Sequence, residues 1–158
     1  MNHRRVLLAL IISALNLSAS AAPLACPDLS AAVQVNACPT EEELKFTYNG
    51  FCSDTAKAYA NQTDSCMRYE DYRVMKNIAL WESKDGVFSG YVSCDLSAGQ
   101  IKALKPSGMQ VATQGKLKKL VCSYPGGLNF TYRTKGACAV DNEKACASDP
   151  ASCKASCD

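Results

Sequence analysis

The chain has 158 residues, of which ten are cysteine, 47% are hydrophobic and 20% are charged. These proportions are ordinary for a globular protein and exclude wholesale disorder, and the length suits a single domain. The sequence has no heptad run and no repeat of solenoid length, which excludes coiled-coil and solenoid folds.

The N-terminus predicts a secretory signal peptide over residues 1–21. Two arginines precede an apolar run at 6–17, and Ala19-Ser20-Ala21 is a small-residue cleavage site. A membrane anchor needs about 20 apolar residues, so this run is too short, and nothing after it is apolar enough to span a bilayer. We therefore expect a secreted or periplasmic protein whose mature chain begins after Ala21.

The mature chain is predicted to have two parts. An α+β domain stapled by disulfides covers residues 22–136, and a cysteine-rich extension covers residues 137–158. The extension has almost no large side chain to bury, so we expect disulfides to pin it to the body. A lipoprotein is the alternative, because Leu24-Ala25-Cys26 is similar to a bacterial lipoprotein cleavage box. Lipidation of Cys26 would leave nine cysteines, an odd number, which disfavours it.

All ten cysteines lie after the signal peptide, and this even number predicts five disulfides in an oxidising compartment. The sequence contains no C-x-x-C, which disfavours a thioredoxin-like redox pair and a zinc knuckle. Cys153 and Cys157 are four residues apart, and we interpret them as structural half-cystines rather than a redox or metal site. The pairing stays open for the whole set: Cys26, Cys38, Cys52, Cys66, Cys94, Cys122, Cys138, Cys146, Cys153 and Cys157.

The only histidine, His3, lies in the signal peptide, so the mature chain has none. Its absence disfavours Ser–His–Asp and Cys–His catalysis and His-ligated metal sites. The sequence has no glycine-rich phosphate loop and no S-x-x-K motif. A carboxylate pair acting on a sugar remains, but no acidic residue has a recognisable catalytic context, and residues 41–43 suit the first turn of a helix or a solvated face. We expect no enzyme, no cofactor and no metal.

Residues 26–66 are predicted to be the more helical part. A short helix is expected within 28–37, and a second from Ser53 or Asp54 to Gln62, capped by one of those two side chains. Between them, Leu44, Phe46 and Tyr48 alternate with polar residues, which predicts a short strand.

Residues 74–135 carry the β signals. Segments 77–83 and 87–95 flank Lys84-Asp85-Gly86, and Asp-Gly between two apolar runs indicates a hairpin. Apolar residues fall on both faces in either register, which predicts central strands covered on both sides. Trp81 is expected in the core. A connection or flap over 97–115 follows, with a short edge strand at Gln110–Thr113.

A second hairpin is predicted around Pro125-Gly126-Gly127, with proline early in a type I turn and a glycine in the left-handed region. With a three-residue loop, the apolar side chains of the two strands share one face and the polar side chains share the other, whereas another loop length mixes them. The hydrophobic pattern therefore selects the register of the hairpin. The predicted pairs are Tyr124–Leu128, Cys122–Phe130 and Leu120–Tyr132 on the apolar face, and Ser123–Asn129, Val121–Thr131, Lys119–Arg133 and Leu117–Lys135 on the other. The fold class that follows is α+β, with short helices on an antiparallel sheet of about four to five strands.

Charge is segregated along the mature chain. Residues 22–95 carry a net charge of −5, residues 96–140 carry +7 without one acidic residue, and residues 141–158 carry −2. Like charges opposite each other on a sheet are unfavourable by about 0.2–1 kcal/mol. The pair of Lys119 and Arg133 therefore predicts a basic binding face. The alternative is that the acidic N-terminal half packs against this strip and neutralises it.

The function expected is that of a non-enzymatic binding protein: an inhibitor, an envelope accessory factor or an effector. Its partner is expected to be a protein or other acidic macromolecule. Nucleic acid is not expected, because the mature chain has a net charge of zero and no nucleic-acid motif. The alternatives are a small carboxylate-dependent hydrolase acting on a sugar, and a structural or antigenic surface protein with no discrete site. The predicted binding residues are Lys116, Lys119, Arg133 and Lys135.

Overall fold

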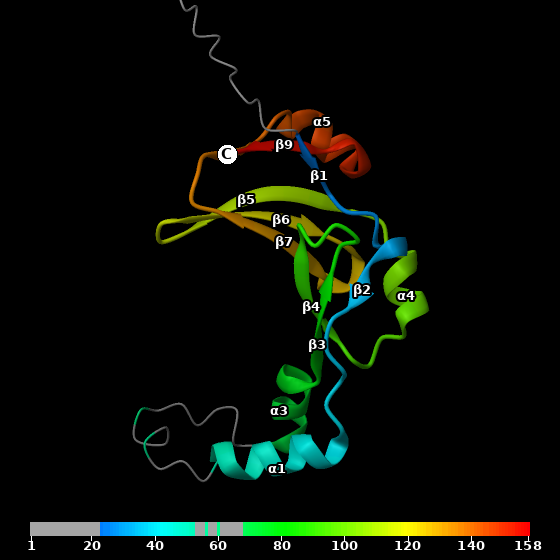
Figure 1. The fold of residues 1–158 in the computed structure, drawn as a ribbon, viewed down its shortest axis with the longest axis vertical. Coiled ribbons are helices and arrows are strands. Elements are labelled where there is room, and N and C mark those ends of the chain that lie inside the picture. The colour runs from blue at the N-terminus through cyan, green and yellow to red at the C-terminus, as the bar shows by residue number, and fades with distance from the viewer. Residues whose placement is uncertain (1–22, 53–55, 57–59, 61–67) are drawn as a thin grey trace, which may run out of the picture.

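A computed structural model of the chain describes residues 23–52, 56, 60 and 68–158. The predicted signal peptide and most of the helix predicted after residue 52 lie outside the described residues. The rest has the predicted α+β architecture, with short helices, two antiparallel sheets and several disulfides (Figure 1). In this part of the chain, no helix combines the length and apolar character needed to cross a membrane.

The larger sheet has six strands in the order β2-β3-β4-β7-β6-β5, one more than the largest number predicted. Strand β4 meets β7 at a single residue pair, Ser89 and Thr131. The sheet therefore divides into a β2–β4 wing and a β5–β7 wing that runs across it (Figure 1). The strands are β2 (Val33–Gln34), β3 (Ile78–Glu82), β4 (Ser89–Ser93), β5 (Gly108–Gln114), β6 (Leu117–Ser123) and β7 (Asn129–Thr134).

Both predicted hairpins are confirmed. Strands β3 and β4 pair across the Lys84-Asp85-Gly86 turn, and β6 and β7 pair in the predicted register, with Lys119 opposite Arg133. The second turn differs in type. Gly126 has φ 76° and ψ 13°, the third position of a type II turn rather than type I, and Gly127 is also left-handed at φ 78°.

The connection between the hairpins is more regular than predicted. The expected edge strand is present as β5, which lies at the edge of the six-stranded sheet. Before it, α4 (Ala98–Ala103) begins with a capping box between Ser97 and Gln100. The S-x-x-Q spacing is the sequence signal for that helix start.

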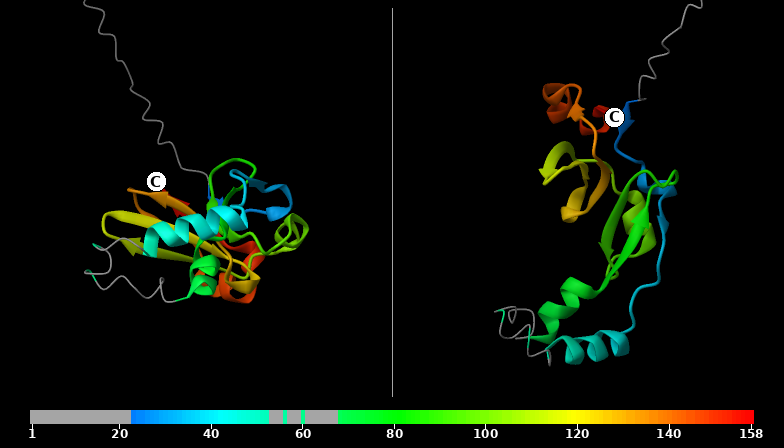
Figure 2. Two further views of the ribbon diagram at one scale, coloured as in Figure 1. Left: turned by 90° about the horizontal axis from the view of Figure 1, so that it is seen from below. Right: turned by 60° about the vertical axis from the view of Figure 1, so that its left-hand side comes forward.

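One face of the six-stranded sheet forms the core. Trp81, Val92, Leu120 and Phe130 are buried there, as predicted for Trp81. The short 3-10 helix η1 (Leu29–Ala31), helix α4 and the C-terminal strand cover this face. The prediction that β3 and β4 are covered on both sides is wrong, because Tyr91 on the opposite face is 66% exposed. Helices α1 and α3 lie beyond the end of β3 instead of over the sheet (Figures 1 and 2).

The N-terminal part departs most from prediction. Only η1 forms in the first predicted helix, and α1 (Glu41–Cys52) is a helix where a strand was predicted. A capping box starts α1, because the Thr40 amide donates to the Glu43 carboxylate (2.7 Å) and the Glu43 amide donates to the Thr40 hydroxyl (3.2 Å). Leu44 and Tyr48, four residues apart, then share one helix face, against which α3 (Tyr69–Lys76) packs.

Four disulfides join described cysteines. Cys26–Cys122 ties the N-terminal segment to β6, and Cys38–Cys94 ties the segment before α1 to the end of β4. A bridged Cys26 has no thiol left to carry a lipid, which argues against the lipoprotein alternative. Cys153 and Cys157 are both half-cystines, as predicted. The bridges are consistent with an oxidising compartment.

Strand pairing, not disulfide bonding, holds the C-terminal extension to the body. Both of its bridges, Cys138–Cys157 and Cys146–Cys153, lie within it, so the prediction that disulfides pin it is wrong. Its last strand pairs with the N-terminal one in the sheet β1-β9-β8, and Ala155 is fully buried. The elements are β1 (Leu24–Ala25), β8 (Cys138–Val140), α5 (Glu143–Ser148), η4 (Pro150–Ser152) and β9 (Lys154–Cys157).

Gly90 allows β7 to cross β4. A Cβ at this position would overlap the Asn129 carbonyl oxygen and lie 3.2 Å from the Phe130 ring. We expect Gly90→Ala to lower the free energy of unfolding by about 2–3 kcal/mol, measured by urea denaturation. Gly99→Ala is the matched control, because a Cβ at Gly99 in α4 meets nothing within 4 Å. Equal stability of the two variants would contradict the crossing described.

The number of disulfides gives a second prediction. Cys52 forms no bridge with a described residue, and the remaining cysteine, Cys66, lies outside the described residues. Because the even count predicts five bridges, we expect neither thiol to react with iodoacetamide in denaturant without reductant, as read by mass spectrometry. Reduced protein is the control, in which all ten should react. If Cys52 and Cys66 were the only cysteines alkylated without reductant, the protein would have four disulfides and the prediction of a fifth would be wrong.

Candidate functional site

The face of the six-stranded sheet opposite the core is open, and we call it the open face. Because side chains alternate along a strand, Leu80, Tyr91, Lys119 and Arg133 all belong to it. None of the side chains in the row that crosses all six strands is buried. That row consists of Val33, Glu82, Ser89, Thr131, Val121 and Gln110.

The structure brings two of the four predicted binding residues together. Lys119 lies directly opposite Arg133 on the open face. Lys116 lies in the turn between β5 and β6, and Lys135 follows the last residue of β7. The turn between β5 and β6 and the end of β7 both lie at the same end of the β5–β7 wing, the left-hand end in Figure 1. Lys118 belongs to the other face, where it donates to the Thr113 hydroxyl at 2.9 Å.

The described part of the acidic half makes no direct ion pair with this basic strip. Among the described residues, no carboxylate forms an ion pair with any of the four predicted side chains. Of the seven basic residues in 96–140, Lys105 alone has a carboxylate partner within the described chain, Asp28, at 3.5 Å. Helix α1, with three glutamates in its first turn, lies beyond the far end of the β2–β4 wing, away from the β5–β7 wing (Figure 1).

A hollow of about 540 Å³ lies where the two wings diverge. The Asn129 amide donates to the Gly127 carbonyl at 3.1 Å, and the Thr131 hydroxyl donates to the Ser89 carbonyl at 3.3 Å. Arg133 donates to no residue that the structure describes, so its guanidinium is available to a ligand. The hollow is lined by Leu80, Ser89, Gly90, Tyr91, Asn129, Thr131 and Arg133.

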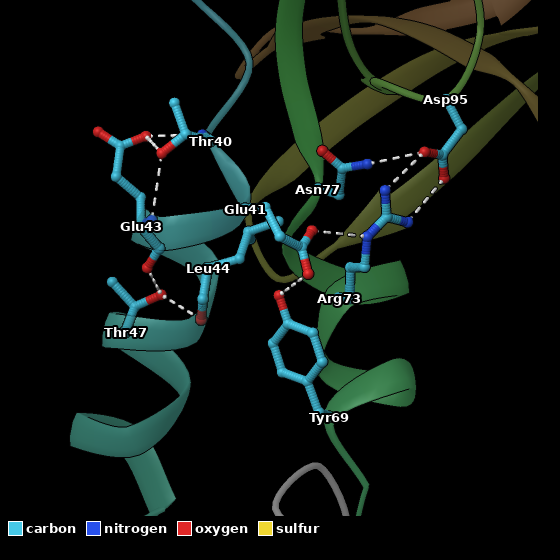
Figure 3. A network of polar contacts seen from close by, with 9 residues as sticks. All are labelled: Thr40, Glu41, Glu43, Leu44, Thr47, Tyr69, Arg73, Asn77 and Asp95. Atoms are coloured by element: carbon cyan, nitrogen blue, oxygen red, sulfur yellow. Dashed lines mark hydrogen bonds and ion pairs between the residues drawn. The ribbon is translucent and has the colours of Figure 1, made fainter.

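A second polar cluster joins α1, α3 and the end of β4 (Figure 3). The Arg73 guanidinium donates to Asp95 through both Nη atoms, at 3.3 and 3.1 Å, and to Glu41 through Nε at 3.2 Å. The Tyr69 hydroxyl donates to Glu41 at 2.8 Å, and the Asn77 amide donates to Asp95 at 3.0 Å. This network fixes the two helices against the sheet.

The electrostatics of this cluster suit positioning rather than proton transfer. The hydrogen bond from Tyr69, and then that from Arg73, lower the pKa of Glu41. Hydrogen bonds also lower the pKa values of Asp28, Glu43 and Asp85. A general acid in a glycosidase needs the opposite, a raised carboxyl pKa. No three His, Cys, Asp or Glu side chains gather as a metal site within the described part of the chain.

Sequence reasoning missed Leu80 and Tyr91 as site residues. The signal was present, since apolar residues fall on both faces of the segments that became β3 and β4. We interpreted that pattern as double coverage, whereas one of the two apolar faces is open. The hollow also requires β4 to lie beside β7, and no local pattern indicates that neighbour.

Comparisons of the chain with models of protein families, with curated proteins and with solved structures gave no match.

The Figure 3 network predicts a pH-dependent contribution to stability from Glu41. Its folded-state pKa lies below the ordinary value of 4.5, so the contribution is present above that value and is lost as pH falls through the folded pKa. We expect Glu41→Gln to be less stable than the natural chain at neutral pH and equal to it in strong acid, measured by urea unfolding.

Glu42→Gln is the matched control, because it removes the same charge from the same helical turn without touching Tyr69 or Arg73. If Glu41→Gln destabilised the protein no more than Glu42→Gln at neutral pH, the stabilising role assigned to the Glu41 carboxylate would be wrong. A destabilisation that persisted in strong acid would also contradict it.

Proposed function

We propose that the protein is a secreted or periplasmic, non-enzymatic binding protein whose basic hairpin face contacts an acidic partner. The pair of Lys119 and Arg133 carries the proposal. The two cations lie directly opposite each other on the open face, without a described carboxylate beside them. Such a pair is unfavourable in the free protein, and an acidic ligand placed over it would turn repulsion into attraction.

The two side chains offer complementary chemistry for an acidic group. Arg133 has a planar guanidinium that can bind a carboxylate through two parallel hydrogen bonds, and Lys119 supplies a compact charge beside it. Lys116 and Lys135, both exposed, extend the positive potential to the end of the wing and favour rapid encounter. An inhibitor, an envelope accessory factor and an effector would all act through such a contact face.

The proposed location rests on two observations. The N-terminal segment has the pattern of a secretory signal peptide, and four disulfides join described cysteines. Disulfides form and persist in the periplasm and outside the cell.

Reversal of the basic face should abolish binding. We expect a cross-linking pull-down from the native extracellular or periplasmic fraction to retain a partner with the oxidised mature chain. It should lose that partner with Lys119→Glu/Arg133→Glu/Lys135→Glu. Affinity for the purified partner should fall by at least about tenfold between low and physiological salt, because screening weakens the contact.

The matched control is Lys84→Glu/Lys144→Glu/Lys154→Glu, which changes net charge equally at exposed positions away from the face. Loss of the partner by both variants would show a general charge effect. Retention by both would favour a structural surface protein or an enzyme.

A further inference from the structure

We infer that the partner is a protein and that it presents an acidic segment carrying an apolar or aromatic side chain to the open face. The inference rests on the proposed function and adds a second, apolar contact to it. The juxtaposition that carries it is the guanidinium of Arg133 with the side chains of Leu80 and Tyr91, which line one hollow.

The apolar half of this site is a row across three neighbouring strands. Leu80 lies opposite Tyr91, and on its other side its carbonyl accepts from the Val35 amide at 2.8 Å. Tyr91 is 66% exposed and Val35 is 51% exposed. Single exposed apolar residues are common, but an aromatic, a leucine and a valine side by side on an open sheet form a patch that favours association. Val33, which is also exposed, extends the patch.

The polar half has one cationic group, Arg133, among the residues that line the hollow, and this charge sets the sign of the ligand. Arg133 donates to no residue that the structure describes, whereas Asn129 and Thr131 each donate within the protein. Glu82 is the one carboxylate on the described strands of this sheet, and it lies on the open face opposite Ser89. Its charge disfavours an acidic group at that end. The ligand's carboxylate therefore belongs beside Arg133 and Lys119, and its apolar side chain belongs over Leu80 and Tyr91.

This combination favours a protein over a polyanion. A sulfated sugar or a polyphosphate repeats its charge along the chain and has no apolar side chain to cover Tyr91 and Val35. A protein segment supplies both groups. Tyrosine and arginine, present here as Tyr91 and Arg133, are among the residues enriched where protein–protein binding energy is concentrated. The hollow has the volume of a typical ligand pocket, so it can seat one large side chain.

Defined probes test the inference. The first is a fluorescently labelled peptide in which Asp and Glu alternate with Leu and Tyr, and the second is a peptide of equal charge with Ser in place of Leu and Tyr. Heparin is the polyanion. Binding to the oxidised mature chain is measured by anisotropy, with heparin as a competitor. Tyr91→Ser and Arg133→Gln are the test variants. Phe46→Ser is the control, because Phe46 is a 78% exposed aromatic on α1, away from the open face.

We expect Tyr91→Ser to weaken binding of the apolar peptide by about tenfold and to leave the serine peptide unchanged. Arg133→Gln should weaken both peptides, and Phe46→Ser neither. If Arg133→Gln weakens both and Tyr91→Ser weakens neither, the apolar contact is overturned while the basic face stands. If heparin binds more tightly than both peptides and Tyr91→Ser does not alter that order, the partner is a polyanion. No effect from either test variant, or no binding of either peptide to the natural chain, overturns the inference.

Discussion

The close crossing of β4 and β7 determines the shape of both faces of the sheet. The two strands share a single residue pair, and Gly90 lets the β7 backbone approach where any side chain would collide. On the core side, the crossing packs Phe130 against residues from both wings and excludes water from it completely. On the other side, the divergence of the wings opens the hollow that Arg133 and Tyr91 both line. Core and candidate site thus have one common cause.

The disulfides stabilise this arrangement unequally. In the chain-entropy model, a bridge stabilises by restricting the unfolded chain, and a longer closed loop gives a larger effect. Cys26–Cys122 spans 96 residues and brings the N-terminal segment beside β6, which lets β1 pair with the C-terminal strand. Cys146–Cys153 spans only seven residues and restricts little beyond the local turn. The long-range bridge therefore has the larger part in stabilising the domain, and the short one in ordering a segment with few large side chains.

The features that the sequence predicts correctly are those in which a segment pairs with the segment next to it along the chain. The register of β6 and β7 followed from sequence because a tight turn fixes the partner, and Lys119 opposite Arg133 came with it. The strand predicted at 44–48 was wrong because Leu44 and Tyr48 also have the four-residue spacing of one helix face. The T-x-x-E capping signal at Thr40 and Glu43 favours the helix. The contact of β4 with β7 and the disulfide pairing depend on chain segments distant in sequence, about which local periodicity carries no information.

The separation of charge along the molecule has different consequences at long and short range. Acidic α1 is held beyond the end of the β2–β4 wing by the Arg73 network and by Cys38–Cys94, whereas the basic strip lies on the β5–β7 wing. Residues 22–158, whose net charge is zero, therefore have their charges separated in space as well as in sequence. At physiological salt, interactions between exposed charges are largely screened beyond about 8 Å. The distant glutamates then have little influence at the hollow, whereas Arg133 lines it and Lys119 lies opposite Arg133. Overall neutrality is therefore compatible with acidic binding at this face. On the proposed function, selection among acidic ligands would come from the apolar residues that line the hollow with Arg133, namely Leu80 and Tyr91, because apolar contacts are not screened by salt.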